Sequence, residues 1–301
     1  MLTNQQKIFW EENGYLVLPN FFSSDEIDRV VQLHQRLWQE CPSNVVVDDM
    51  DTNRRCYMIS LSEEEKKHRF KVNDLYINYE EIRDLSLNKR LGDILGELLT
   101  EVPVLCNTLS LDYGTEQFLH VDSLYMTPLT DNALVASWIA LEDCHPDAGP
   151  LWYIPGSHKI PIYRFSSGSP HVVEKEFPDW QKYMAGEVKN KNLNEEFFYP
   201  KKGDVFIWHS QLLHGGSRIK DLSLTRKSLV SHYFTKTDCI NLKSKLVGWD
   251  GGYWMNKPVL EVRDTKAEVV VKKPNPEINI IEHKLRTTLH YFRLWKRDIF
   301  E

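Results

Sequence analysis

From Val102 onward, the chain is a series of short β-type runs separated by turn residues. The runs are Val104–Asp112, Glu116–Val121, Ala133–Leu141, Pro150–Pro155, Asp204–Trp208 and Ser228–Thr235. Short strands at this spacing are typical of an antiparallel sandwich or barrel. The pattern therefore predicts a mainly β core.

Helices are expected on both sides of this core. The N-terminal residues predict a helix over Asn4–Asn13, a strand over Tyr15–Phe22 and a second helix that begins at a capping box from Ser23 to Glu26. We also expect a helix over Leu87–Leu99 and an amphipathic helix over Asn279–Ile299.

No internal repeat or low-complexity linker divides the sequence. We therefore expect one domain over residues 1–301. Its N-terminal helices would occupy residues 1–100, its core about 100–240 and its C-terminal extension 241–301.

Two polar segments interrupt the pattern. Pro42–Asp74 carries a charge run from Glu63 to Lys67, which indicates a solvated face or a lid. Ile160–Pro200 contains aromatic residues without helical or strand periodicity, and loops of that length are usually functional. We expect the two segments to form the lid and wall over the site and to order on substrate binding. The alternative is that the insertion only covers the outside of the sheet.

Charge and cysteine usage exclude several functions. The 37 Lys and Arg against 43 Asp and Glu give a net charge of -6, which disfavours nucleic acid as a partner. The five cysteines are scattered without a C-x-x-C pair, which predicts reduced thiols and a cytoplasmic location. The polar N-terminus does not resemble a signal peptide, and the longest apolar run, Ala133–Leu141, is too short to cross a membrane. We therefore expect no membrane partner, and the oligomeric state stays open.

Two of the eleven histidines stand out by their context. A period-two strand would place His120 and Asp122 side by side on one face. His214, at the far end of another expected strand, could complete a site of two imidazoles and one carboxylate. Such a facial triad leaves positions open on the metal and is typical of non-haem Fe(II) oxygenases. His158 is interpreted as structural, and His209 is out of step with an inward-facing strand.

Arg226 lies twelve residues after His214, at the start of the next expected strand. A guanidinium there could make a bidentate contact with a carboxylate inside the barrel. An H-x-D motif, a distal histidine and a following arginine occur in this order in 2-oxoglutarate oxygenases.

Longer blocks of the sequence resemble the phytanoyl-CoA dioxygenase (PhyH) family. Asn13–Glu26 is similar to the opening block of the family, and Ser137–Asp143 and Gly149–Lys159 are similar to its central block. The Gly203-Asp204 step before the distal histidine matches as well. The resemblance covers roughly residues 7 to 235 and implies a double-stranded β-helix, a jelly roll of the kind that cupins share.

The resemblance also implies the roles of individual residues. The iron ligands would be His120, Asp122 and His214, and Arg226 would bind the distal carboxylate of the cosubstrate 2-oxoglutarate. Further residues that would line the cosubstrate pocket are Asn107, Trp138 and Ser217.

The expected activity is that of an Fe(II)/2-oxoglutarate-dependent dioxygenase, which uses O2 and releases succinate and CO2. The intact Asp122 favours hydroxylation over halogenation, and leaves desaturation or ring closure open. The expected substrate is a small metabolite, an intermediate of a biosynthetic pathway, with an unactivated C–H bond. The alternatives are an acyl-CoA hydroxylase and a non-enzymatic metal- or ligand-binding barrel.

Overall fold

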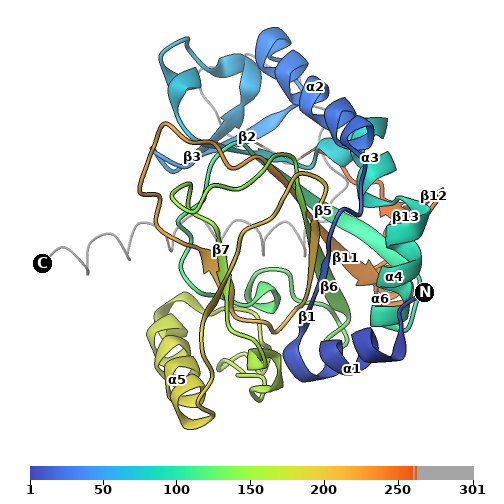
Figure 1. Ribbon diagram of the computed structural model, residues 1–301, viewed down its shortest axis with the longest axis vertical. Coiled ribbons are helices and arrows are strands. Elements are labelled where there is room, and N and C mark those ends of the chain that lie inside the picture. Colours follow the sequence, from blue (N-terminus) through green and yellow to red (C-terminus); the bar gives the residue numbers. More distant parts are fainter. Residues whose placement is uncertain (260–261, 263–301) are drawn as a thin grey trace, which may run out of the picture.

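The computed structural model describes residues 1–259 and 262, and within them a mainly β core is flanked by helices (Figure 1). The strand order of the large sheet is β1 (Tyr15–Leu18), β9 (Val205–His209), β6 (Leu134–Ala140), β11 (Ser228–Thr235), β5 (Pro103–Leu111), β4 (Phe70–Asn73), β2 (Val46–Asp49) and β3 (Arg54–Tyr57). Off this path, β13 (Gly252–Met255) pairs with β5 and with β12 (Leu246–Trp249). The small sheet has the order β10 (His214–Gly216), β7 (Leu151–Tyr153) and β8 (Glu196–Phe198).

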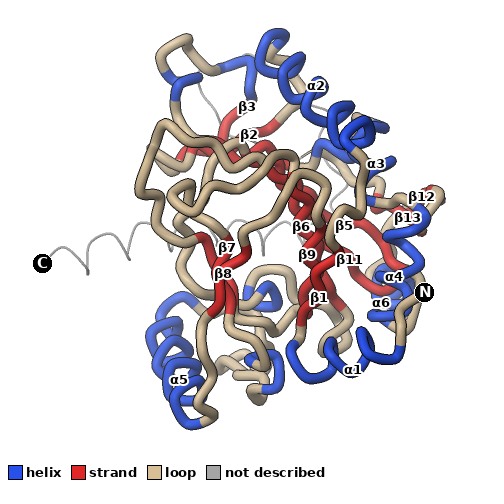
Figure 2. Tube along the Cα trace, viewed as in Figure 1, coloured by secondary structure: helices blue, strands red, loops and turns tan. Residues whose placement is uncertain are grey.

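Residues alternate between two apolar layers along the central strands. In β6, Val135 and Ile139 belong to the layer that contacts the helices, whereas Trp138 belongs to the layer that contacts the small sheet. The same alternation puts Ile207 of β9 on the helix side and Trp208 on the inner side. Since successive strand residues point to opposite faces, the inner layer lies between the two sheets of the jelly roll (Figure 2). The predicted fold class is confirmed.

The N-terminal helices cover the outer face of the large sheet (Figure 1). They are α1 (Asn4–Asn13), α2 (Ser24–Glu40), α3 (Glu80–Ser86) and α4 (Lys89–Leu99). Later in the chain come α5 (Phe177–Asn190) and α6 (Lys236–Asn241). The predicted capping box is present, because Ser23 and Glu26 bond each other's backbone N–H. The predicted helix from Leu87 is shorter, since the side chain of Asn88 caps α4 by accepting from the backbone of Arg90.

The observed strands differ from the sequence patterns in two places. The polar segment Pro42–Asp74 contains β2, β3 and β4, whose pattern is hidden because the charged residues Asp48 and Arg55 pair across neighbouring strands. Conversely, Glu116–Val121 is not a strand, since Glu116 has a left-handed φ of 48° and only His120 pairs, through an isolated bridge.

The insertion Ile160–Pro200 forms a packed layer of its own instead of a long loop. It contains α5 and β8, and its buried Phe165, Phe177 and Trp180 pack against Val121 and other residues that follow His120. The predicted helix over Asn279–Ile299 lies outside the described residues.

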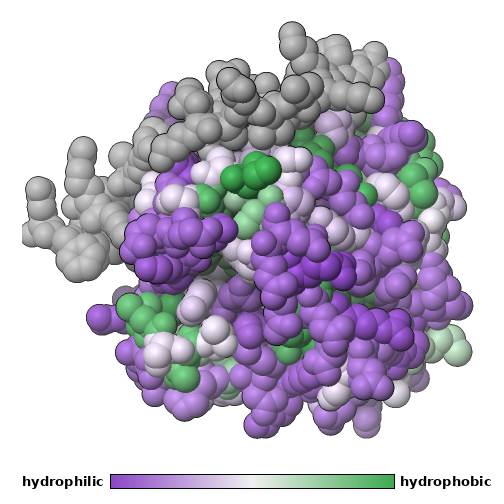
Figure 3. All heavy atoms as spheres, turned by 90° about the horizontal axis from the view of Figure 1, so that it is seen from above, coloured by the Kyte–Doolittle hydropathy of each residue, from purple (hydrophilic) through white to green (hydrophobic). Residues whose placement is uncertain are grey.

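The surface of the described part is mixed. Figure 3 shows a mostly hydrophilic face on which apolar side chains form small separate patches. Among the described residues, the helices include no segment long and apolar enough to cross a membrane. All five cysteines are buried thiols.

Candidate metal centre

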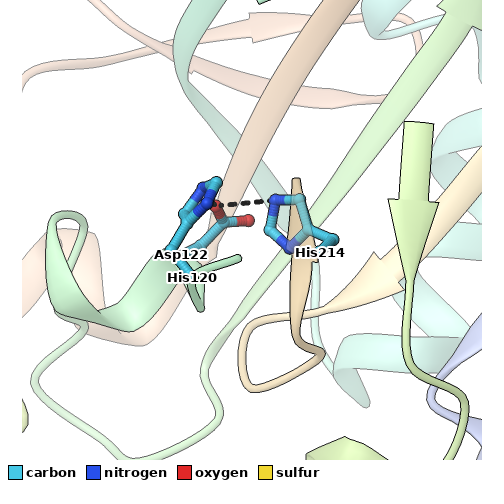
Figure 4. A group of neighbouring side chains, drawn as sticks. All are labelled: His120, Asp122 and His214. Atoms are coloured by element: carbon cyan, nitrogen blue, oxygen red, sulfur yellow. Dashed lines mark ion pairs between the residues drawn. The ribbon is translucent and has the colours of Figure 1, made fainter. Parts of the chain in front are cut away.

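His120, Asp122 and His214 come together at one point inside the barrel (Figure 4). Asp122 starts a short 3-10 turn, Asp122–Leu124, and His214 starts β10. One nitrogen or oxygen atom from each of the three buried side chains lies within 4.8 Å of the others. The Oδ1 atom of Asp122 is 3.8 Å from Nε2 of His120 and 3.5 Å from Nε2 of His214. These are the donor atoms and spacing that a divalent transition metal needs.

Both imidazoles are held in the tautomer that a metal requires. Nδ1 of His120 lies 2.9 Å from the carbonyl oxygen of Phe118, and Nδ1 of His214 lies 2.9 Å from that of Leu212. A carbonyl only accepts, so each Nδ1 carries the proton and each Nε2 has its lone pair for a metal; on His120 that lone pair faces the amide nitrogen of Gln117 at 3.3 Å. Burial, together with the neighbouring His214, lowers the pKa of His120 to about 3. Burial also lowers the pKa of His214, so both rings are neutral at neutral pH.

The two oxygens of Asp122 have different surroundings. Oδ1 faces the two histidine nitrogens, whereas Oδ2 accepts a 2.8 Å hydrogen bond from Nε1 of Trp208 and lies 3.5 Å from Nε2 of His232. Burial opposes ionisation of this carboxyl, but His214 and His232 outweigh it and lower its pKa. Asp122 is therefore a carboxylate with one oxygen available to a metal.

Trp208 and His232 were not predicted as site residues. Both belong to runs that were predicted as strands, and both line the same cavity as the triad. The alternation of strand faces could have found them, because His232 is two residues after the inward-facing Val230.

Arg226 is a buried cation without a carboxylate partner in the described part of the chain. Only 3% of its surface is exposed, and its Nη1 donates to the carbonyl oxygen of Gly149 across 2.7 Å. Its Nε has no hydrogen-bond partner within residues 1–259, and its guanidinium carbon lies 5.8 Å from the centre of the Trp138 ring. Burial lowers the pKa of Arg226 to about 10, so the group stays charged at neutral pH. A buried, unpaired cation is unfavourable unless an anion binds beside it.

One cavity of about 1400 Å³, counted with the open space at its mouth, connects these groups. The predicted residues that line it are His120, Asp122, His214, Arg226, Asn107 and Trp138. Its outer wall includes residues of the segment Pro42–Asp74, among them Asp48, Arg55 and Lys71. The lining residues include none from the insertion Ile160–Pro200, so only the first of the two expected wall segments reaches the cavity in the described structure.

The other two predicted cosubstrate residues, Asn107 and Ser217, are both hydrogen-bonded within the protein. Ser217 is not among the residues that line the cavity, because it lies beyond β10 and its hydroxyl donates to the carbonyl oxygen of Pro150 across 2.8 Å. Asn107 lines the cavity, but its amide is already bonded within the protein. Its Nδ2 donates to Asp74 across 2.9 Å, and its Oδ1 lies 3.1 Å from Nδ1 of His232.

His158 and His209 lie together, away from the cavity. Their ring centres are 5.4 Å apart, and Nε2 of His158 is 3.3 Å from the carbonyl oxygen of Glu11. The His158 ring packs on Gly14, where a Cβ would come within 2.4 Å of the ring. Gly14 has a φ of 77°, which suits glycine.

The fold and this side-chain cluster define the class of the protein, an oxygenase that depends on Fe(II) and 2-oxoglutarate. Within that class, the chain belongs to the phytanoyl-CoA dioxygenase (PhyH) family, whose sequence model matches residues 10–227. A similar relative is the peroxisomal phytanoyl-CoA dioxygenase of Mus musculus, 27% identical over 259 residues, which cover 79% of this chain and 70% of the relative. Another is phytanoyl-CoA dioxygenase 1 of Oryza sativa subsp. japonica, which is 24% identical over 86% of this chain and 95% of the relative.

Solved structures share the fold. EctD from S. alaskensis, in its apo form, is 19% identical and superimposes with a TM-score of 0.59 over 79% of this chain and 78% of that one. The carbocyclase SnoK from nogalamycin biosynthesis, a non-heme enzyme that depends on alpha-ketoglutarate, is 16% identical with a TM-score of 0.56, covering 78% and 84%. EctD has also been solved with bound Fe, and with 2-oxoglutarate and 5-hydroxyectoine.

Proposed function

We propose that this chain hydroxylates an unactivated C–H bond of a small metabolite, with His120, Asp122 and His214 as the iron ligands. The observation that carries the proposal is the combination in one cavity of this triad with the buried Arg226, which has no carboxylate partner among the described residues. When bound, iron and 2-oxoglutarate supply the oxidant from O2, with release of succinate and CO2. A non-enzymatic barrel has no need of the buried cation.

The charges of the cavity match the cosubstrate. Besides Arg226, the cavity is lined by Lys71, whose Nζ lies 3.4 Å from Oε1 of Gln117 and forms no ion pair within the described residues. A dianion such as 2-oxoglutarate can neutralise two such cations. We assign the distal carboxylate to Arg226, beside Trp138, because this guanidinium is the more deeply buried cation. Asn107 also lines the cavity and is a further candidate for the wall of the cosubstrate pocket.

The outer wall favours a polar substrate. Asp48 accepts two hydrogen bonds from Arg55, at 2.6 and 2.8 Å, and Asn53 and Asn73 line the same side of the cavity. Polar groups at fixed positions orient a polar ligand, whereas a branched acyl chain needs an apolar wall. The alternative substrate is an acyl-CoA thioester, which the names of the phytanoyl-CoA dioxygenase relatives indicate.

A substrate panel tests this proposal. Polar biosynthetic intermediates and acyl-CoA thioesters would each be added to the iron-loaded protein, and succinate formation would be measured with and without them. We expect a polar metabolite to stimulate succinate formation, and Asn53→Ala to reduce that stimulation. If only thioesters stimulated succinate formation, the substrate would be an acyl-CoA instead of a small polar metabolite.

We also propose that residues 1–301 form a single catalytic domain and that the protein acts in the cytoplasm. The five cysteines are buried and form no disulfide with one another, which supports a reducing compartment. Fractionation of the native host cell would test the location, and limited proteolysis would test the domain.

A further inference from the structure

We propose that Trp208, supported by His232, is a positioning residue of the metal centre that holds the outer oxygen of Asp122. This inference rests on the proposed iron site. With Oδ2 held by the protein, only Oδ1 is available to the metal, so Asp122 binds through a single oxygen. A carboxylate bound through both oxygens would take one of the positions that a facial triad leaves open for the cosubstrate and O2.

Trp208 is placed rigidly enough for this role. It lies in β9, paired with Tyr15 of β1 on one side and Ala136 of β6 on the other, and only 2% of its surface is exposed. Its Nε1 donates to Oδ2 of Asp122 across 2.8 Å. Its ring centre also lies 4.9 Å from that of His214. One side chain therefore contacts two of the three candidate ligands.

His232 approaches the same oxygen from β11. Its Nε2 lies 3.5 Å from Oδ2 of Asp122, and its Nδ1 lies 3.1 Å from Oδ1 of Asn107. Nδ2 of Asn107 donates to Asp74, a carboxylate that can only accept, so the direction of the amide is fixed. Asp74 is in turn paired with Lys257 at 2.9 Å.

We call His232, Asn107, Asp74 and Lys257 the buried relay. All four side chains are buried, and each contacts the next. Because Oδ1 of Asn107 only accepts, Nδ1 of His232 carries a proton toward Asn107, and Nε2 donates toward Asp122 when the ring is the doubly protonated imidazolium. The relay therefore fixes the orientation of the His232 ring, which approaches Oδ2 of Asp122 from β11 while Trp208 approaches it from β9.

The test is Trp208→Phe, which keeps an aromatic ring and removes the N–H. Trp254→Phe is the matched control, because Nε1 of Trp254 is also buried but has no hydrogen-bond partner in the part of the chain that the structure describes. Apoprotein would be titrated with Co(II) as a spectroscopic substitute for Fe(II), and the affinity and the visible ligand-field spectrum would be recorded. We expect Co(II) to bind roughly 10- to 100-fold more weakly to Trp208→Phe, the usual effect of removing a partner of a metal ligand, and the spectrum to change. Trp254→Phe should match the wild type in both measurements.

A second pair keeps the test decisive if Trp208→Phe does not fold. Asn107→Leu breaks the buried relay. Thr108→Val, at the next residue of β5, removes a buried hydroxyl that has no hydrogen-bond partner among the described residues. Asn107→Leu should weaken Co(II) binding and change its spectrum, and Thr108→Val should do neither. Wild-type affinity and spectrum in folded Trp208→Phe or Asn107→Leu would overturn this inference. If the wild type bound no Co(II), the proposed iron site itself would fail.

Discussion

His120 and His214 exchange both backbone hydrogen bonds, each N–H donating to the carbonyl oxygen of the other across 3.0 Å. This single bridge joins a loop to β10, and the centres of the two imidazole rings lie 4.4 Å apart. The spacing of the candidate ligands is thus set by the backbone, which makes the site sensitive to changes beside the bridge.

Gly215→Ala should weaken metal binding at least about tenfold, by analogy with other changes around metal ligands. A Cβ at Gly215 would come within 2.5 Å of the carbonyl oxygen of Gln117, so the segments that carry the two histidines must move apart. Gly186→Ala in α5 is the control, since its Cβ would meet nothing within 4 Å. Co(II) titration of both variants checks this, and equal affinities would contradict it.

Arg226→Met should raise the 2-oxoglutarate concentration needed for half-maximal succinate formation by at least about tenfold. The lost interaction is a charge-assisted hydrogen bond to a buried carboxylate, worth roughly 1.5 to 3 kcal/mol. Metal affinity should be unchanged. Lys227→Met is the control, because Lys227 is paired with Glu142 at 3.7 Å instead of lining the cavity. If Lys227→Met had the larger effect, the anchoring role would move to that residue.

Lys257→Met should lower the free energy of unfolding by about 3 to 5 kcal/mol, because it leaves the buried carboxylate of Asp74 without its cation. The two side chains are 4% and 2% exposed, so solvent cannot replace the lost partner. Asp74→Asn in the same chain should restore most of the loss, since asparagine tolerates the left-handed φ of 51° at this position. Urea unfolding measures both variants. A double variant as unstable as Lys257→Met alone would show that charge burial is not the cause.

Trp180→Ala should lower the free energy of unfolding by about 3 to 5 kcal/mol, as for other large side chains removed from a core. Trp180 is 3% exposed and belongs to the same packed cluster as Val121 and Leu124, beside the ligands. The variant should therefore increase hydrogen exchange around residues 118–125. If exchange rose only in α5 itself, the insertion would not support the metal loop.

The sequence was sufficient for the architecture, which depends on local patterns, and for the triad, which the resemblance to a family implied. Period-two runs predicted the strands of the core, and the capping box from Ser23 to Glu26 predicted the start of α2. The H-x-D motif and the distal histidine predicted a cluster that the structure brings together. Whether these residues bind iron stays a prediction.

The errors came from interactions between residues far apart in the chain. The charge run from Glu63 to Lys67 indicated a solvated segment, whereas the neutralisation of Asp48 by Arg55 across β2 and β3 depends on tertiary structure. The aromatics of the insertion have no regular period, since they pack around α5 and the loop after His120 instead of along one strand. The contact of Trp208 with Asp122 joins two segments that no local pattern connects.

Iron-dependent turnover of 2-oxoglutarate tests the central claim most directly. Purified apoprotein would be loaded with Fe(II) and supplied in air with 2-oxoglutarate labelled at the C1 carboxyl. Labelled CO2 and unlabelled succinate would be measured, and they should form in equal amounts. We expect turnover that requires both Fe(II) and O2, and its loss in His120→Ala, Asp122→Ala and His214→Ala variants that remain folded by circular dichroism. Turnover that persisted in any of these variants with bound iron, or a wild type that bound iron and 2-oxoglutarate without forming succinate, would contradict the account.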